Sequence, residues 1–201
     1  MRAAIHALKY DRIHSAAGRL GAMLAVAIAQ LAHDAPAGLL VVPVPLHRSK
    51  HNQRGFNQAR ALASCAIEAL RKTHPTWHLV LAPATLMRLR STESQAGLTP
   101  RQRRQNVRGA FKVSDPSAIA GKNILLVDDI LTTGATARAA SQSLLRAGAA
   151  SVYVATLARA RRFDHNAQSR SFGSSTQPGV EPANVSPLAS LHSSSSTHQP
   201  F

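Results

Sequence analysis

The segment ILLVDDILTTGATARAA, residues 124–140, constrains the fold more than any other part of the sequence. Its first four residues form a short apolar run that is typical of a buried strand, and we expect this strand to end at Asp128. From Ala137 onward, small and apolar residues recur at helical spacing, and Gly148 lies where a helix usually ends. The segment therefore predicts a strand, then a loop with two acids and Thr-Thr-Gly, then a helix.

The loop between this strand and this helix is a candidate ligand site. In an open α/β sheet, ligands bind at the carboxyl ends of the strands, and the free N–H groups of the next helix favour an anion. Asp128 and Asp129 repel each other, so a fold keeps them adjacent where sugar hydroxyls, a cation or solvent satisfies them. The residues that follow are small or carry hydroxyls: Thr132, Thr133, Gly134, Ala135 and Thr136. Together they suit a ribose 5-phosphate.

Two other interpretations of the segment are open. The first is a strand that ends in a solvated acidic turn, followed by a helix with a threonine cap. The second is the acidic strand end of a P-loop ATPase, but that class needs a G-x-x-x-x-G-K-[ST] loop, and the sequence contains none.

Three sequence blocks, in order, resemble a known family. ILLVDDILTTGAT resembles the phosphoribosyl pyrophosphate (PRPP) motif of type I phosphoribosyltransferases. VPVPLHRSKHNQRGFNQA at 42–59 and RLRSTESQAGLTPRQRRQNVRGAF at 88–111 resemble the ComF/GntX branch of that superfamily, the competence protein F group. The resemblance implies an α/β fold with a twisted, mainly parallel sheet and helices on both faces. It covers residues 1–162, whose N-terminal part would form a hood over the site.

A second cluster of site residues follows the predicted strand Leu39–Val42. The segment Pro43–Gly55 is rich in cations, and guanidinium groups near a helix N-terminus suit phosphate oxygens. The resemblance implies that this segment is the pyrophosphate loop, with these contacts: Arg48, Ser49, Lys50 and Arg54. For Arg54 an alternative is open, in which it pairs with backbone or with a surface acid.

A polar stretch after the predicted strand Thr85–Leu89 is the third candidate element. The resemblance implies a flexible loop that closes over the reacting centre and excludes water, with Arg90 and Gln95 in contact with PRPP. Thr99 and the residues after it predict a capped, basic helix to about Asn106. For the arginines in and beside this helix, a solvated helix face is the commoner interpretation: Arg101, Arg103, Arg104 and Arg108.

Composition limits the class of protein. A chain of 201 residues with 44% hydrophobic content can bury a core, and no apolar run is long enough for a membrane span, so we expect a cytoplasmic protein. The resemblance implies a four-cysteine zinc module in many relatives, but this sequence has only Cys65, and its histidines lack zinc-site spacing. We expect no zinc. Residues 163–201 are rich in Ser, Pro and Gln, which predicts a disordered tail.

The expected ligand is Mg-PRPP, with Mg²⁺ bound through substrate oxygens rather than directly by the protein. If the protein is an enzyme, it transfers the phosphoribosyl group to an acceptor that the sequence does not identify. The alternative is a PRPP-sensing or partner-binding module in DNA uptake, in contact with proteins of the competence machinery. The net charge of +15 favours a polyanionic partner, but aromatic content of 4% predicts that any single-stranded DNA binding is weak. Oligomeric state is left open.

Overall fold

The computed structural model describes residues 14–90, 99–131, 133–160, 180–181 and 184–187. Five helices lie in these ranges: α2 (His14–Ala29), α3 (Arg48–Arg54), α4 (Gln58–Thr73), α5 (Pro100–Val107) and α6 (Ala135–Arg146). The strands are β1 (Gly38–Pro43), β2 (His78–Leu81), β3 (Leu86–Arg88), β4 (Phe111–Val113), β5 (Asn123–Leu131), β6 (Ser151–Ala160), β7 (Val180–Glu181) and β8 (Asn184–Pro187).

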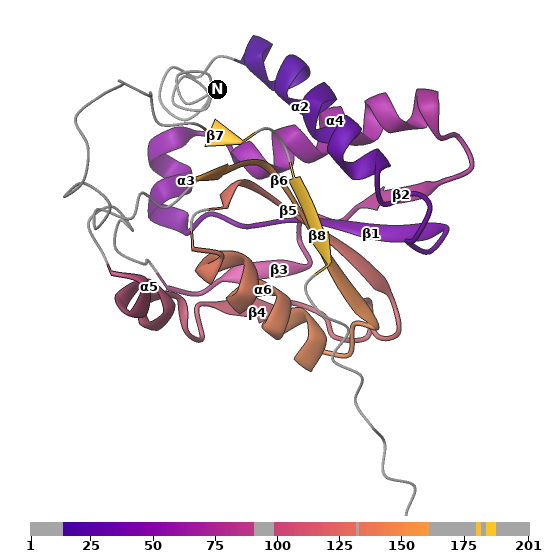
Figure 1. Cartoon of the computed structure of the whole chain (residues 1–201). Coiled ribbons are helices and arrows are strands. Elements are labelled where there is room, and N and C mark those ends of the chain that lie inside the picture. The colour runs from indigo at the N-terminus through magenta and orange to yellow at the C-terminus, as the bar shows by residue number, and fades with distance from the viewer. Residues whose placement is uncertain (1–13, 91–98, 132, 161–179, 182–183, 188–201) are drawn as a thin grey trace, which may run out of the picture.

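The main sheet has the strand order β2-β1-β5-β6-β7, and β8 also pairs with β6. The first four strands of this order are parallel, whereas β7 and β8 run antiparallel to β6. A second sheet consists of the antiparallel pair β3 and β4. Figure 1 shows α2 and α4 on one side of the main sheet, and α6 with the small sheet on the other. The predicted α/β fold, a mainly parallel sheet with helices on both faces, is confirmed.

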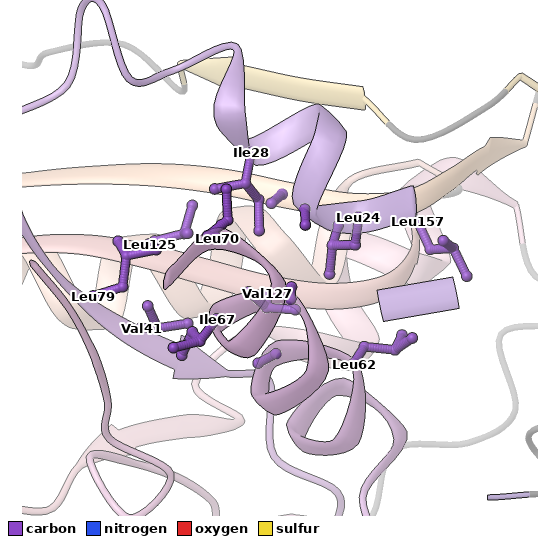
Figure 2. Close-up of a cluster of buried hydrophobic side chains, with 14 of the residues drawn as sticks. Leu24, Ile28, Val41, Leu62, Ile67, Leu70, Leu79, Leu125, Val127 and Leu157 are labelled. Carbon is purple, nitrogen blue, oxygen red and sulfur yellow. The ribbon is translucent and has the colours of Figure 1, made fainter. Parts of the chain in front are cut away.

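Strand β5 is apolar on both faces because a hydrophobic core covers each of them. Leu125 and Val127 pack with α2 and α4 in one core, which Figure 2 shows, together with Leu24 of α2 and Leu62 of α4. Ile124 and Leu126 pack in the other core, with α6, β3 and β4. The strand therefore lies between these two cores, which fix where its carboxyl end emerges.

Apolar residues recur at helical spacing from Ile13 to Leu31 and predict a helix with one buried face. Its members that the structure describes are all buried: Ala17, Leu20, Leu24, Ile28 and Leu31. Leu31 lies just beyond the end of α2, and Ile13 lies outside the described residues. In α4, Cys65 is half-buried and packs against the same core.

Two predicted boundaries were wrong. Strand β5 continues to Leu131 instead of ending at Asp128, because β6 runs beside it and pairs Ile130 with Ala158 and Leu131 with Arg159. The cationic segment predicted as a loop contains helix α3. Local capping explains this helix: the His47 side chain accepts a hydrogen bond from the Ser49 N–H, and Gly55, with φ of 78°, ends it.

Part of the C-terminal tail forms secondary structure. Strands β7 and β8 lie in the segment predicted to be disordered, and β8 pairs from Tyr153↔Pro187 to Thr156↔Asn184 along β6. The reason is that the outer edge of β6 offers unpaired backbone groups, and a polar segment can pair with them without a core of its own.

Candidate functional site

The candidate site lies at the carboxyl edge of the parallel sheet, where β1 and β5 end side by side. Pro43 of β1 is in register with Val127 of β5, and the Val44 N–H donates to the Val127 carbonyl over 2.8 Å. The acidic pair follows Val127 directly in the chain, and the cationic segment follows Val44. The sheet therefore places the two sequence-predicted clusters next to each other, although about eighty residues of sequence separate them.

The two acids extend β5 and are both half-buried. One Asp128 carboxylate oxygen accepts from the Asp129 N–H over 2.9 Å, and one Asp129 oxygen accepts from the Ile130 N–H over 2.8 Å. Side chains alternate between the two cores from Ile124 to Val127, but Ile130 packs against the same core as Val127, so the alternation does not continue regularly through the acids. The two acids therefore lie where the regular alternation of the strand ends.

Arg88 of β3 lies close to Asp128, a relation that the sequence did not predict. Burial lowers the pKa of the Arg88 guanidinium, and the charge of Asp128 acts against that shift. The guanidinium carbon lies 5.4 Å from the centre of the Phe111 ring, and Phe111 is the residue paired with Arg88 across the small sheet. Asp128 therefore has a cationic neighbour that is held by the β3–β4 sheet.

The predicted phosphate-binding residues lie between β5 and the N-terminus of α6. The Thr133 hydroxyl is buried and has no hydrogen-bond partner among the described residues. Gly134 has φ of 71° and precedes α6 without a side-chain cap bond, so the first N–H groups of the helix have no side-chain cap. Ala135 is buried and Thr136 half-buried, and Thr132 lies outside the described residues. This arrangement is suited to an anion.

The cationic segment offers side chains at two levels of exposure. Arg48 and Ser49 are exposed in the first turn of α3, whereas Lys50 and Arg54 are half-buried. The Arg54 guanidinium donates to the Gln58 side-chain oxygen over 3.4 Å, so its described hydrogen bond goes to a neutral amide. The predicted cations are thus presented from a short helix rather than from an extended loop.

The third predicted element is only partly described. Arg90 follows β3, is exposed, and donates a hydrogen bond to the Arg108 carbonyl. Gln95 lies outside the described residues. Helix α5 begins as predicted, with a complete capping box between Thr99 and Gln102.

Within the described ranges, no cluster of three or more His, Cys, Asp or Glu side chains could hold a metal ion. The acidic pair alone fits an ion that arrives with its substrate, because Mg²⁺ commonly keeps water and phosphate oxygens as most of its ligands. In the same ranges, no helix combines the length and apolar character needed to cross a membrane.

Comparison with known proteins decides the family. The phosphoribosyl transferase domain family matches residues 66–171, a range that contains β5, the acidic pair and α6. The chain belongs to the phosphoribosyltransferase family. A glutamine phosphoribosylpyrophosphate (PRPP) amidotransferase from B. subtilis, solved with ADP and GMP, is 25% identical with a TM-score of 0.42 over 70% of this chain and 26% of that one.

The relatives of this chain place it in the ComF branch of the family. DNA utilization protein YhgH from Escherichia coli O157:H7 is 34% identical over 157 residues, 77% of this chain and 65% of that protein. Competence protein F from Haemophilus influenzae is 32% identical over 68% of this chain and 57% of its own length. Competence protein ComFC from Bacillus subtilis is 38% identical over 60% of this chain and 44% of its own length. The family prediction is confirmed, and the chain spans 65% or less of each of these three relatives.

Proposed function

We propose that the carboxyl edge of the sheet binds PRPP with Mg²⁺. One observation carries the proposal: the acidic pair near the end of β5 is followed by a helix N-terminus that has no side-chain cap. Between them lies the Thr133 hydroxyl, which is buried and has no hydrogen-bond partner within the described part of the chain. A buried hydroxyl without a partner costs free energy, and a phosphate oxygen would remove that cost. A sugar phosphate supplies both hydroxyl donors for the acids and an anion for the helix.

Each part of the site has a role in this proposal. Asp128 and Asp129 accept hydrogen bonds from the ribose hydroxyls, and residues 132–136 hold the 5-phosphate with backbone N–H and threonine hydroxyl groups. The pyrophosphate is held by Ser49 and by the three cations of the α3 segment, Arg48, Lys50 and Arg54. When bound with the substrate, Mg²⁺ neutralises pyrophosphate charge and so favours its departure.

Transfer of the phosphoribosyl group is the finer part of the proposal. The site residues would hold the ribose and the leaving pyrophosphate in fixed positions, and Arg90 and Gln95 would help to exclude water from a positively charged transition state. No side chain is assigned to deliver the acceptor. The fold alone does not decide turnover.

A non-catalytic PRPP-binding module is the second candidate function. It is favoured by the names of the relatives, which refer to DNA utilization and competence rather than to a reaction. We propose that single-stranded DNA binds weakly, through its phosphates, to exposed cations on α5 and in the segment after it: Arg101, Arg108 and Lys112. We also propose proteins of the competence machinery as partners. A cytoplasmic location stays a prediction.

Calorimetry with Mg-PRPP tests the binding proposal. The double variant Asp128→Asn/Asp129→Asn should bind at least about 100-fold more weakly, since a hydrogen bond to a charged group contributes about 1.5–3 kcal/mol. Glu68→Gln, which removes an exposed carboxylate on α4, is the control and should bind like the wild type. Wild-type affinity in the double variant would contradict the proposal. Pyrophosphate release across a panel of bases then separates an enzyme from a binding module.

A further inference from the structure

A single side chain, Asn57, connects two elements of the candidate site. Its carbonyl oxygen accepts from the Arg60 N–H over 3.1 Å, which caps the N-terminus of α4. Its amide nitrogen donates to the Val44 carbonyl over 3.0 Å. Val44 is itself bonded through its N–H to the Val127 carbonyl, one residue before the acidic pair. Asn57 therefore links the start of α4 to the end of β1 and, through it, to β5.

This link closes the segment that carries the cations. Val44 and Asn57 are separated by 13 positions in the chain, and all of α3 lies between them. Helix α3 buries none of its residues, so packing in a core does not fix its orientation. The closing hydrogen bond instead fixes the two ends of the segment, which reduces the number of conformations available to the cations.

The chemistry of the side chain is specific to asparagine. The position needs an acceptor for the helix cap and a donor for the Val44 carbonyl on the same short side chain, and asparagine carries both. Aspartate keeps the cap but places an oxygen against the carbonyl. Serine keeps a cap but lacks the second arm that reaches Val44.

We propose that Asn57 is a positioning residue that holds the cationic segment 47–54 against the pyrophosphate group of the ligand. The inference rests on the proposed function, because it takes the α3 segment as the pyrophosphate subsite. It assigns Asn57 no contact with the ligand. Its effect should be confined to the pyrophosphate end, since the loop before α6 receives no hydrogen bond from it.

The test compares Asn57→Ser and Asn57→Asp in the full chain, with inorganic pyrophosphate plus Mg²⁺ and ribose 5-phosphate as separate probes in calorimetry. Both variants keep a favourable cap, so both should fold, which thermal melting verifies. Loss of one hydrogen bond and of the fixed segment should weaken pyrophosphate binding by about tenfold or more in both variants. Ribose 5-phosphate affinity should stay within about twofold, as expected for a site that keeps its contacts.

Ser64→Ala is the control, because Ser64 is exposed on α4, the helix that Asn57 caps, and lies outside the cationic segment. It should leave both affinities unchanged. If only Asn57→Asp weakens pyrophosphate binding, the added negative charge is responsible and the positioning role is overturned. Equal loss of both probes in Asn57→Ser would also overturn it, because the effect would then be general. A wild-type chain that binds neither probe would contradict the proposed function itself.

Discussion

Helices α2 and α4 cross so closely that the same substitution should have opposite effects at two glycines of α2. A Cβ added at Gly21 would lie 2.3 Å from the Cys65 Cβ and 3.3 Å from the Ala66 nitrogen. A Cβ added at Gly18, one turn earlier, would meet no atom within 4 Å. Backbone and Cβ atoms cannot rotate away, so Gly21→Ala must push the helices apart, whereas Gly18→Ala need not.

Two opposing free energies, helix propensity and overpacking, decide whether each substitution stabilises or destabilises the protein. Alanine in place of glycine favours a helix by about 0.8–1 kcal/mol, and Gly18→Ala should gain most of this. At Gly21 the same gain is opposed by overpacking, which costs about 1–3 kcal/mol and should be near the upper end for a contact this short. We expect Gly21→Ala to lose about 1–2 kcal/mol net.

Urea unfolding, followed by circular dichroism, measures the free energy of unfolding of both variants, and thermal unfolding measures their melting temperatures. The dependence of the unfolding free energy on urea concentration should stay the same if only stability changes. The melting temperature should rise by about 2–4 °C in Gly18→Ala and fall by a similar amount or more in Gly21→Ala. A stabilised Gly21→Ala protein would refute the reasoning, because it would mean that the helices do not cross at this distance. Cys65→Gly added to Gly21→Ala should recover part of the loss, since it removes the opposing Cβ.

Four further outcomes can be measured. Trp77→Phe removes the indole N–H that donates to the Pro36 carbonyl over 3.0 Å, and should destabilise the fold by about 1–3 kcal/mol in urea unfolding. Thr99→Ala removes the cap of α5 and should cost about 0.5–2 kcal/mol, seen as faster amide exchange in that helix and restored mostly by Thr99→Ser. Burial, helped by the charge of Glu68, raises the pKa of the Cys65 thiol, so alkylation by iodoacetamide should reach half its maximal rate at a higher pH than that of a free cysteine. Truncation after Arg162 removes the strands that cover the edge of β6, and sedimentation should then detect concentration-dependent self-association, whereas an unchanged monomer fraction would contradict this.

Most features set by neighbouring residues were predicted well from the sequence, although the locally capped helix α3 was not. The capping box at Thr99 depends on Gln102, three positions away, and both ends of it were visible in the sequence. The apolar run before Asp128 identified a buried strand for the same reason. The position of the acids at a sheet edge followed from the general rule for parallel sheets, without knowledge of their neighbours.

Features set by distant residues were missed. The end of β5 depends on β6, which supplies hydrogen-bond partners as far as Leu131. The relation of Arg88 to Asp128 crosses forty positions and depends on how the small sheet packs. Asn57 could have been found as a helix cap, because asparagine is favoured there, but its bond to Val44 has no sequence signal.

The central place of β5 in the sheet gives the two halves of the candidate site different dynamics. Strand β5 pairs with β1 on one side and β6 on the other, so its amide groups should exchange with solvent only when the whole domain opens. Helix α3 buries no residue and should open locally and much more often. In the proposed function, the acids then form a preformed platform, and the ordering entropy of binding falls on the cations. A ligand that lacks the pyrophosphate group would avoid that entropy and should bind without slowing exchange in α3.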